Sequence, residues 1–314
     1  MERIACFCIN PAIDLTIWTD GYSLSEPVGV KREIAYAGGK GINVSKFLSS
    51  SGNQNIVLGL VGKQNSREFI SLLQKDDIRF CLSECEGKTR ENLSIVFPDG
   101  KMLKINKDGK ILADEKLSVL RGYASEVYDK FDPSKTNYSI FSGSLPPSVS
   151  KETAMELILE ARNSKVCIDT TAFSKEDYRK LKPFLIKPNH LELGEICSMK
   201  IQSVDDIIKA ASHLTDHVGN ILCSFGANGV VLVSGNRAYH ARVPRLEVVS
   251  TIGAGDATMA GFVSAHIKGL SLSQCVKTAA AFGSSKVLIE GTGNIKMSDV
   301  EMLLNEITVE EISF

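Results

Sequence analysis

The sequence predicts an α/β protein with a mostly parallel central sheet and helices on both faces of that sheet. Short apolar runs suited to buried strands alternate with longer segments of helical spacing. Repeated βα units of this kind favour parallel strands joined by crossover helices. The 314 residues contain no internal repeat, low-complexity segment or long linker. We therefore expect one domain over residues 1–314.

Composition and charge narrow the classes of partner. The chain has 36 Lys+Arg against 37 Asp+Glu, and a net charge of -1 argues against nucleic acid or an anionic membrane as partner. No apolar run approaches the ~20 residues that span a bilayer. The first strand-like run, 4–9, is too short for a signal-peptide core, so we expect a cytoplasmic protein. The 8 cysteines include no Cys-x-x-Cys pair and are expected to be reduced thiols.

The elements follow in chain order. Residues 4–9 form a buried strand that ends at Asn10-Pro11, so Asp14 lies at the carboxyl edge of the sheet. That edge is where open α/β sheets bind ligands, although Asp14 taken alone is better explained as the cap of a turn. The further strands are expected at 56–61, 138–141, 166–169, 185–187, 220–224 and 230–233, and the helices at 66–74, 114–130, 150–162, 190–197 and 204–214.

Four other segments alternate like short, half-exposed strands. They are 15–19, 32–36, 91–97 and 101–105, and Pro98-Asp99-Gly100 joins the last two as a hairpin. Together they predict a small second sheet outside the main one.

The stretch 249–261 carries the strongest chemical signal. Apolar and β-branched residues at 243–251 predict a strand, Gly253-Ala254-Gly255 a turn, and the spacing after Asp256 a helix. The glycines keep side chains off the turn, so the N–H groups at the helix start can face an anion. Asp256, which the helix dipole keeps ionised, could accept a proton from a hydroxyl that attacks phosphorus. A capping Asp in an ordinary turn is the alternative.

A second glycine turn, Gly38-Gly39-Lys40-Gly41, opens a helix that contains Asn43 and runs to Ser51-Gly52. The glycines allow a small ligand to approach the backbone, and the Asn43 amide can bond hydroxyls. No Gly-x-x-x-x-Gly-Lys-Ser/Thr occurs in the chain, so this turn is not a Walker A loop. No Gly-x-Gly-x-x-Gly follows the first strand, which argues against a nicotinamide dehydrogenase.

Val249–Gly261 and Ala37–Val44 resemble two motifs of the PfkB (ribokinase-like) carbohydrate kinase family, in the family's order. The resemblance covers nearly the whole chain, and Ser250 stands where many members have Asp, as in the branch that phosphorylates sugar phosphates. It implies a ribokinase-like three-layer sandwich with a small β-sheet lid, inserted as segments at about 11–37 and 88–107. In such families the lid often forms a homodimer contact.

The resemblance further implies transfer of a phosphoryl group from ATP, with Mg²⁺, to a hexose phosphate. Asp256 would be the base, and the backbone N–H groups of Gly253, Ala254 and Gly255 would hold the developing charge. The sugar phosphate would be held by Asp14, Gly38, Gly39, Lys40, Asn43, Arg90 and Ser144. ATP would be held by Lys187, Ser224, Gly226, Asn228, Gly229 and Gly255, and Mg²⁺ by Asn189 and Glu192.

Several of these residues have a plain structural alternative. Arg90 could bind a phosphate bidentately or be a solvated surface arginine. Lys31 and Arg32 are further basic candidates in the lid. Asn189 and Glu192 are spaced as a helix-capping pair as well as a loose magnesium pair that acts through water.

The implied substrate is fructose 1-phosphate, converted to fructose 1,6-bisphosphate, with tagatose 6-phosphate as the close alternative. A sugar-phosphate sensor built on a kinase scaffold is the non-enzyme alternative. Small residues at 279–285 could flank the adenine of ATP.

Overall fold

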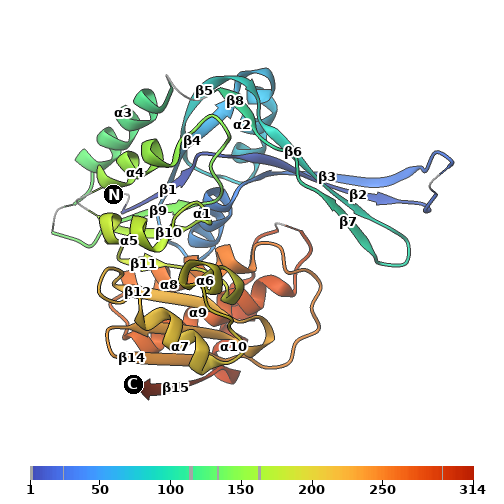
Figure 1. Ribbon diagram of the computed structural model, residues 1–314. Helices are drawn as coiled ribbons and strands as arrows, with labels where there is room; N and C mark the ends of the chain where they lie inside the picture. Colours follow the sequence, from blue (N-terminus) through green and yellow to red (C-terminus); the bar gives the residue numbers. More distant parts are fainter. Residues whose placement is uncertain (1–2, 24, 113–115, 133, 162–163, 292) are drawn as a thin grey trace.

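The computed structural model describes residues 3–23, 25–112, 116–132, 134–161, 164–291 and 293–314. An 11-stranded sheet runs through the body of the molecule (Figure 1). Its strands, in spatial order, are β15 (Thr308–Ser313), β14 (Arg237–Arg242), β13 (Val230–Ser234), β12 (Asn220–Ser224), β11 (Leu185–Ile186), β10 (Lys165–Asp169), β9 (Tyr138–Ser142), β1 (Ile4–Cys8), β4 (Ile56–Gly62), β5 (Phe80–Lys88) and β8 (Lys110–Leu112).

The strands from β12 across to β5 pair in parallel, whereas β13, β14 and β15 at one edge and β8 at the other pair antiparallel. The expected mostly parallel sheet is therefore confirmed. Parallel pairing brings the carboxyl ends of β1, β9, β10 and β11 to one edge, which positions the polar residues that follow these strands near one another.

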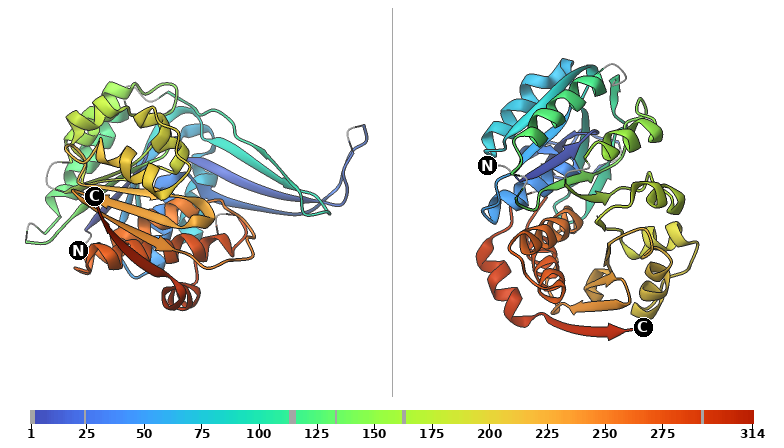
Figure 2. Two further views of the ribbon diagram at one scale, coloured as in Figure 1. Left: turned by 60° about the horizontal axis from the view of Figure 1, so that its bottom comes forward. Right: turned by 90° about the vertical axis from the view of Figure 1, so that its left-hand side faces the viewer.

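Helices cover both faces of this sheet, which confirms the three-layer sandwich (Figures 1 and 2). Successive residues of β1 alternate between two apolar cores, with Cys6 in one and Phe7 in the other. The helices on the Cys6 side are α1 (Lys40–Ser50), α2 (Ser66–Lys75), α8 (Ala254–Ile267), α9 (Leu272–Val287) and α10 (Met297–Glu306), and those on the Phe7 side are α3 (Lys116–Asp129), α4 (Lys151–Leu159), α5 (Lys175–Leu181), α6 (His190–Cys197) and α7 (Val204–Ser212).

A separate 4-stranded sheet projects from the body in Figures 1 and 2, and we call it the lid. Its spatial order is β3 (Val30–Gly38), β2 (Ala12–Thr19), β6 (Arg90–Val96) and β7 (Met102–Ile105), and β6 and β7 form the expected hairpin. Side chains alternate across these strands, so one face of β2, β6 and β7 carries the polar side chains Asp14, Thr16, Asn92, Ser94 and Lys104, and the opposite face carries Leu15, Ile17, Leu93, Ile95, Leu103 and Ile105. We call the first of these the polar face. The small second sheet predicted from the sequence is confirmed, although β2 and β3 are longer than expected.

The strand predicted at 243–251 is wrong, because no residue of this segment is in a strand. Strand β14 already has β13 and β15 on its two sides, which leaves no edge at that place for another partner. The sequence patterns also missed α5, α10, β5, β8, β14 and β15. The last of these, Thr-Val-Glu-Glu-Ile-Ser, carries charged side chains typical of an edge strand. Of the helix expected at 114–130 and the one expected at 150–162, residues 114–115 and 162 lie outside the described residues.

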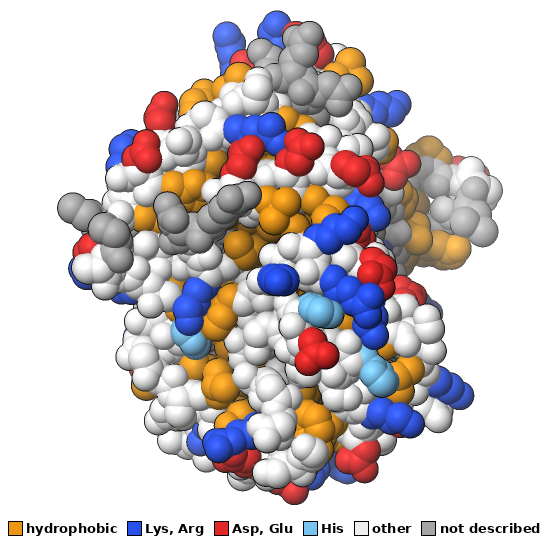
Figure 3. All heavy atoms as spheres, turned by 60° about the vertical axis from the view of Figure 1, so that its left-hand side comes forward, with side chains coloured by type: hydrophobic (Ala, Val, Ile, Leu, Met, Phe, Trp, Pro, Cys, Tyr) orange, Lys and Arg blue, Asp and Glu red, His pale blue; other side chains and the backbone are white. Residues whose placement is uncertain are grey.

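The surface and the cysteines agree with the composition. Acidic and basic side chains are interspersed over the face shown in Figure 3. All 8 cysteines are free thiols, and Cys6 and Cys8 are buried on β1. Within the described ranges, no helix is both long and apolar enough to cross a bilayer.

Candidate active site

A cavity of about 1110 Å³ connects the polar face of the lid with the starts of α1 and α8 and with the loop 243–248. Asp14 and Arg90 line it at the lid, Asp256 at the start of α8, and Ser224 farther along at the end of β12. The carboxyl edge of the sheet forms its floor. Residues that are far apart in the sequence thus line one cavity. This is the arrangement expected if the two glycine motifs belong to the same site.

The start of α8 has an open N-terminus. Gly253 precedes the helix in the left-handed conformation (φ 78°), which glycine adopts without strain, and no side chain of the described residues caps the helix there. The Ala254 N–H donates to the Thr251 carbonyl at 3.3 Å. The N–H groups of Gly253 and Gly255 donate to no other described residue, so these two, rather than all three expected, are free to bind an anion.

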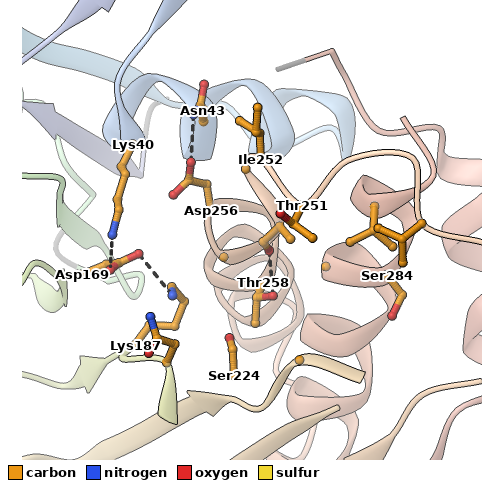
Figure 4. A pocket seen from close by; sticks show the side chains of 18 of the residues that line it. Lys40, Asn43, Asp169, Lys187, Ser224, Thr251, Ile252, Asp256, Thr258 and Ser284 are labelled. Carbon is orange, nitrogen blue, oxygen red and sulfur yellow. Dashed lines mark hydrogen bonds and ion pairs between the residues drawn. The ribbon is translucent and has the colours of Figure 1, made fainter. Parts of the chain in front are cut away.

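Asp256 is buried beside this turn, with 5% of its surface exposed. Its Oδ2 accepts a hydrogen bond of 2.8 Å from Nδ2 of Asn43 on α1 (Figure 4). Burial, reinforced by the charge of Asp169, raises the pKa of Asp256 to about 7, although Asn43 and two lysines oppose the shift. The expectation that the helix dipole keeps Asp256 ionised therefore holds only above about pH 7, because desolvation raises the pKa of this carboxyl. A pKa near 7 is suited to a general base.

Asp169 links the two sides of the cavity. It ends β10 and is buried between two ammonium groups, Nζ of Lys40 at 2.9 Å and Nζ of Lys187 at 3.3 Å (Figure 4). Burial tends to raise the pKa of Asp169, but the two lysines outweigh it and hold the pKa below its ordinary value. The sequence analysis missed this residue. Its place at the end of a predicted strand, as for Asp14, was the signal that could have found it.

Lys187 lies next to the turn Gly253–Gly255. Its side chain is buried, and a Cβ atom added to Gly255 would lie 3.0 Å from its Nζ. Glycine at this position therefore leaves room for the ammonium group. The arrangement puts a positive charge next to the free N–H of Gly255, which suits a phosphate.

The lid end of the cavity is polar. Oδ1 of Asp14 accepts a 2.8 Å hydrogen bond from Asn92, and burial raises the pKa of Asp14. Arg90 lines the cavity, with Nε 3.4 Å from the Pro11 carbonyl and Nη2 3.3 Å from the Asn10 carbonyl. Lys40, Gly39 and Asn43 also line it, and Oδ1 of Asn43 is a buried acceptor without a partner among the described residues. The sequence analysis missed the other lid residues of this wall, which are Thr16, Asn92, Ser94, Lys104 and Asn106.

Three predicted site residues do not line this cavity. Gly38 instead leaves room for Asp14, since an added Cβ would lie 2.0 Å from its Oδ2. The Ser144 hydroxyl accepts a 2.9 Å hydrogen bond from Asn10, and the Asn228 carbonyl lies 2.7 Å from Nε2 of His240. The weaker candidates Lys31 and Arg32 also lie outside the cavity wall, and the Arg32 guanidinium stacks on Trp18.

Asn189 and Glu192 form a reciprocal capping box at the start of α6. Oδ1 of Asn189 accepts from the N–H groups of Leu191 and Glu192, and Oε2 of Glu192 accepts from the Asn189 N–H. Both side chains also line the cavity. Within the described part of the chain, no three His, Cys, Asp or Glu side chains are grouped closely enough to hold a metal. Oxygen donors near a phosphate site nevertheless fit Mg²⁺, which keeps several waters and needs few protein ligands.

The end of the cavity away from the lid is lined by small residues of β12, the loop that follows it, and α9. Ser224, Gly226 and Gly229, which were predicted to hold ATP, line this part of the cavity, and Oγ of Ser224 is buried without a partner among the described residues. Opposite them, Ala280, Gly283 and Ser284 line the cavity from α9, within the segment expected to flank an adenine.

Comparison with known proteins shows the family of the chain. A model described as the pfkB family carbohydrate kinase matches residues 1–299. The 1-phosphofructokinase of Vibrio cholerae is 29% identical over 314 residues, covering 99% of this chain and 98% of the relative. A tagatose-6-phosphate kinase of Staphylococcus epidermidis is 24% identical over 315 residues, covering 98% and 100%. The crystal structure of phosphofructokinase-2 from Escherichia coli in complex with substrates and products superposes with a TM-score of 0.87 at 22% identity, over 98% of this chain and 99% of that one.

Proposed function

The chain belongs to the pfkB family of carbohydrate kinases, and on that premise we propose that it transfers the γ-phosphoryl group of ATP to fructose 1-phosphate, with fructose 1,6-bisphosphate as product. The observation that carries the proposal is the contact between Asp256 and Asn43, which joins the two glycine motifs at 2.8 Å inside the cavity. A carboxyl of pKa about 7 at an open helix start suits proton transfer next to a phosphate.

The reaction requires little covalent chemistry from the protein. The sugar hydroxyl oxygen bonds to the γ-phosphorus, the bond from that phosphorus to the bridging oxygen of ADP breaks, and the hydroxyl proton passes to Asp256. The N–H groups of Gly253 and Gly255, together with Lys187, stabilise the charge on the transferred group. When bound, Mg²⁺ neutralises charge on the ATP phosphates, and Asn189 and Glu192 are the residues that would hold it through water.

The lid end supplies the proposed contacts to the sugar phosphate. Asp14 and the free Oδ1 of Asn43 accept hydrogen bonds from sugar hydroxyls, and Arg90 and Lys40 bind the phosphate already present on the substrate. Lys104 of β7, which lines the same wall, adds a third positive charge for that phosphate. Three cationic side chains at this end favour a phosphorylated sugar over a neutral one.

The substrate is tested by ADP-release assays with fructose 1-phosphate, tagatose 6-phosphate and free fructose. We expect kcat/KM for fructose 1-phosphate to exceed that for tagatose 6-phosphate by at least about tenfold, with fructose far weaker, because a missing phosphate leaves the cationic groups unpaired. A reversed order would assign the chain to tagatose 6-phosphate. Binding of sugar phosphate in calorimetry without any ADP release would instead support the sensor.

A homodimer through the lid is the partner we propose. On the face opposite the cavity, the strand register aligns Leu15, Leu93 and Ile105 in one row and Ile17, Ile95 and Leu103 in the next. Ile105 and Leu103 are 40% and 47% exposed, and a second copy of this face would cover both rows. Light scattering should give a dimer for the parent protein and a monomer for Leu103→Lys. A monomeric parent would reject this partner.

A further inference from the structure

Lys286, a buried lysine with no role in the site described above, lies next to the turn Gly253–Gly255. Lys286, in the last turn of α9, is 0% exposed. Its Nζ donates a 3.1 Å hydrogen bond to the Ile289 carbonyl. Lys286 does not line the cavity, so its ammonium group is behind the turn rather than in the substrate space.

Close packing of α8 on α9 puts Lys286 there. A Cβ added to Gly261 would lie 2.8 Å from Cβ of Phe282, and one added to Gly283 would lie 2.4 Å from Oγ1 of Thr258, so the two helices approach as only glycine permits. Lys286 is three residues beyond Gly283 and therefore lies on the same face of α9, one turn closer to the start of α8.

The Lys286 side chain therefore lies next to the turn. A Cβ added to Gly253 would lie 3.5 Å from Cε of Lys286 and 3.6 Å from the ring of Phe47. The neighbouring backbone is also fixed to α9, because the N–H groups of Val249 and Ser250 donate to the Val287 carbonyl at 2.8 and 3.2 Å. Gly253 and Gly255 thus have a lysine each, Lys286 on one side and Lys187 on the other.

The charge state of Lys286 favours an electrostatic role. Burial lowers the pKa of Lys286 to about 8, and the Asp256 carboxylate opposes that shift, so the group is mostly an ammonium at neutral pH. Among the described residues its Nζ bonds the Ile289 carbonyl, and the ion pairs between these residues do not include Lys286. Burying a cation without a paired anion costs free energy of folding. Lys286 therefore destabilises the fold, which argues against a purely structural role.

We propose that Lys286 is a positioning residue that holds the Gly253 turn and adds a fixed positive charge behind it, where negative charge develops on the transferred phosphoryl group. It acts through the turn and touches neither substrate. The inference rests on the kinase function proposed above and extends the cationic environment of the same site. Since the charge matters most when phosphoryl transfer is under way, its loss lowers kcat more than it raises either KM.

Two substitutions separate the charge from the hydrogen bond. Lys286→Gln keeps a donor for the Ile289 carbonyl without the charge, and Lys286→Met removes both. Lys277→Met, on the same helix but outside the cavity wall, is the matched control. We expect kcat to fall about 30-fold in both Lys286 variants, with KM for ATP and for the sugar phosphate within about threefold of the parent, and no change in the control. Ammonium chloride should restore part of kcat in Lys286→Ala, and sodium chloride at equal ionic strength should not.

The outcomes distinguish this inference from the function on which it rests. A parent protein that phosphorylates no sugar phosphate rejects the function. An active parent with Lys286→Gln within twofold of its kcat rejects the inference alone. Raised KM for both substrates with a lowered Tm and no ammonium rescue would make Lys286 merely structural. The same conclusion follows if Lys286→Gln and Lys286→Met both fail to fold while Lys277→Met folds.

Discussion

The two ends of the cavity are built differently. At the transfer end, Asp256, Asp169 and Lys187 are 5%, 3% and 4% exposed, and each has a partner within the protein. At the lid end, the residues of β7 are all exposed and those of β6 are half-buried. Groups that fix one another before substrate arrives can stabilise a transition state at no further reorganisation cost, whereas exposed groups are ordered by the ligand they bind. Changes at the transfer end should therefore lower kcat, and changes at the lid should raise KM.

The largest expected effect comes from removing the base at the transfer end. Asp256→Asn keeps the shape of the side chain but cannot accept the hydroxyl proton, so kcat should fall by about 10³-fold or more while both substrates still bind. Steady-state kinetics and calorimetric binding of ATP and sugar phosphate test this. A variant within a few-fold of the parent would remove Asp256 from the role of base.

A smaller loss is expected when the buried ion pairs are broken. Asp169→Asn leaves Lys40 and Lys187 without their shared anion, so Lys187 loses its fixed position beside Gly255. We expect kcat/KM for ATP to fall about 10²-fold, together with a lower Tm.

The matched control for that loss is Asp177→Asn, which breaks the 3.1 Å pair with Lys151 away from the cavity. It should lower Tm without lowering kcat. If both variants lost activity in proportion to stability, Asp169 would be a structural residue and the contrast between the two ends would weaken.

At the lid end, Arg90→Ala should raise KM for the sugar phosphate about 10- to 100-fold and leave KM for ATP within about threefold, since a charge-assisted phosphate contact is lost from one substrate only. Lys101→Ala is the control, because Lys101 is exposed in the hairpin and pairs with Asp99. An unchanged KM for the sugar phosphate would mean that Arg90 only braces the Asn10 and Pro11 carbonyls.

The sequence predicted features that depend on local patterns and missed those that depend on packing between distant segments. Glycine turns have a local signature, so the starts of α1 and α8 were predictable, as were the lid strands with their alternating pattern. The end of a predicted strand marked the position of Asp169, but its pairing with Lys40 and Lys187 depends on segments far apart in the chain. Lys286 carries no local signature, because packing of α9 against the start of α8 puts it beside Gly253. The strand prediction for segment 243–251 was wrong for a related reason. Its β-branched composition suits a strand, but strand formation also needs a free sheet edge.

The smallest expected effect is a pH dependence of stability at the transfer end. Because burial raises the pKa of Asp256 from 3.8 to about 7, the native state binds more protons than the unfolded state between these values. The stability that this group contributes is then fully present below pH 3.8 and is lost as the pH rises through about 7. Asp256→Asn has no titrating carboxyl at this position, so its stability does not contain this pH dependence. The difference in Tm between the variant and the parent should therefore be a few degrees larger, in favour of the variant, at pH 8.5 than at pH 5.5.

Activity should follow the opposite course, because only the deprotonated Asp256 accepts the hydroxyl proton, so kcat/KM of the parent rises through about pH 7. Above pH 7 the buried Asp256 carboxylate therefore lowers the stability of the fold while it serves as the base. Such an exchange of stability for activity is expected at a preorganised site. Scanning calorimetry of parent and variant at both pH values measures the stability difference directly. An equal difference in Tm at the two values would show that Asp256 titrates at its ordinary pKa, and the transfer end would then owe its chemistry to position alone.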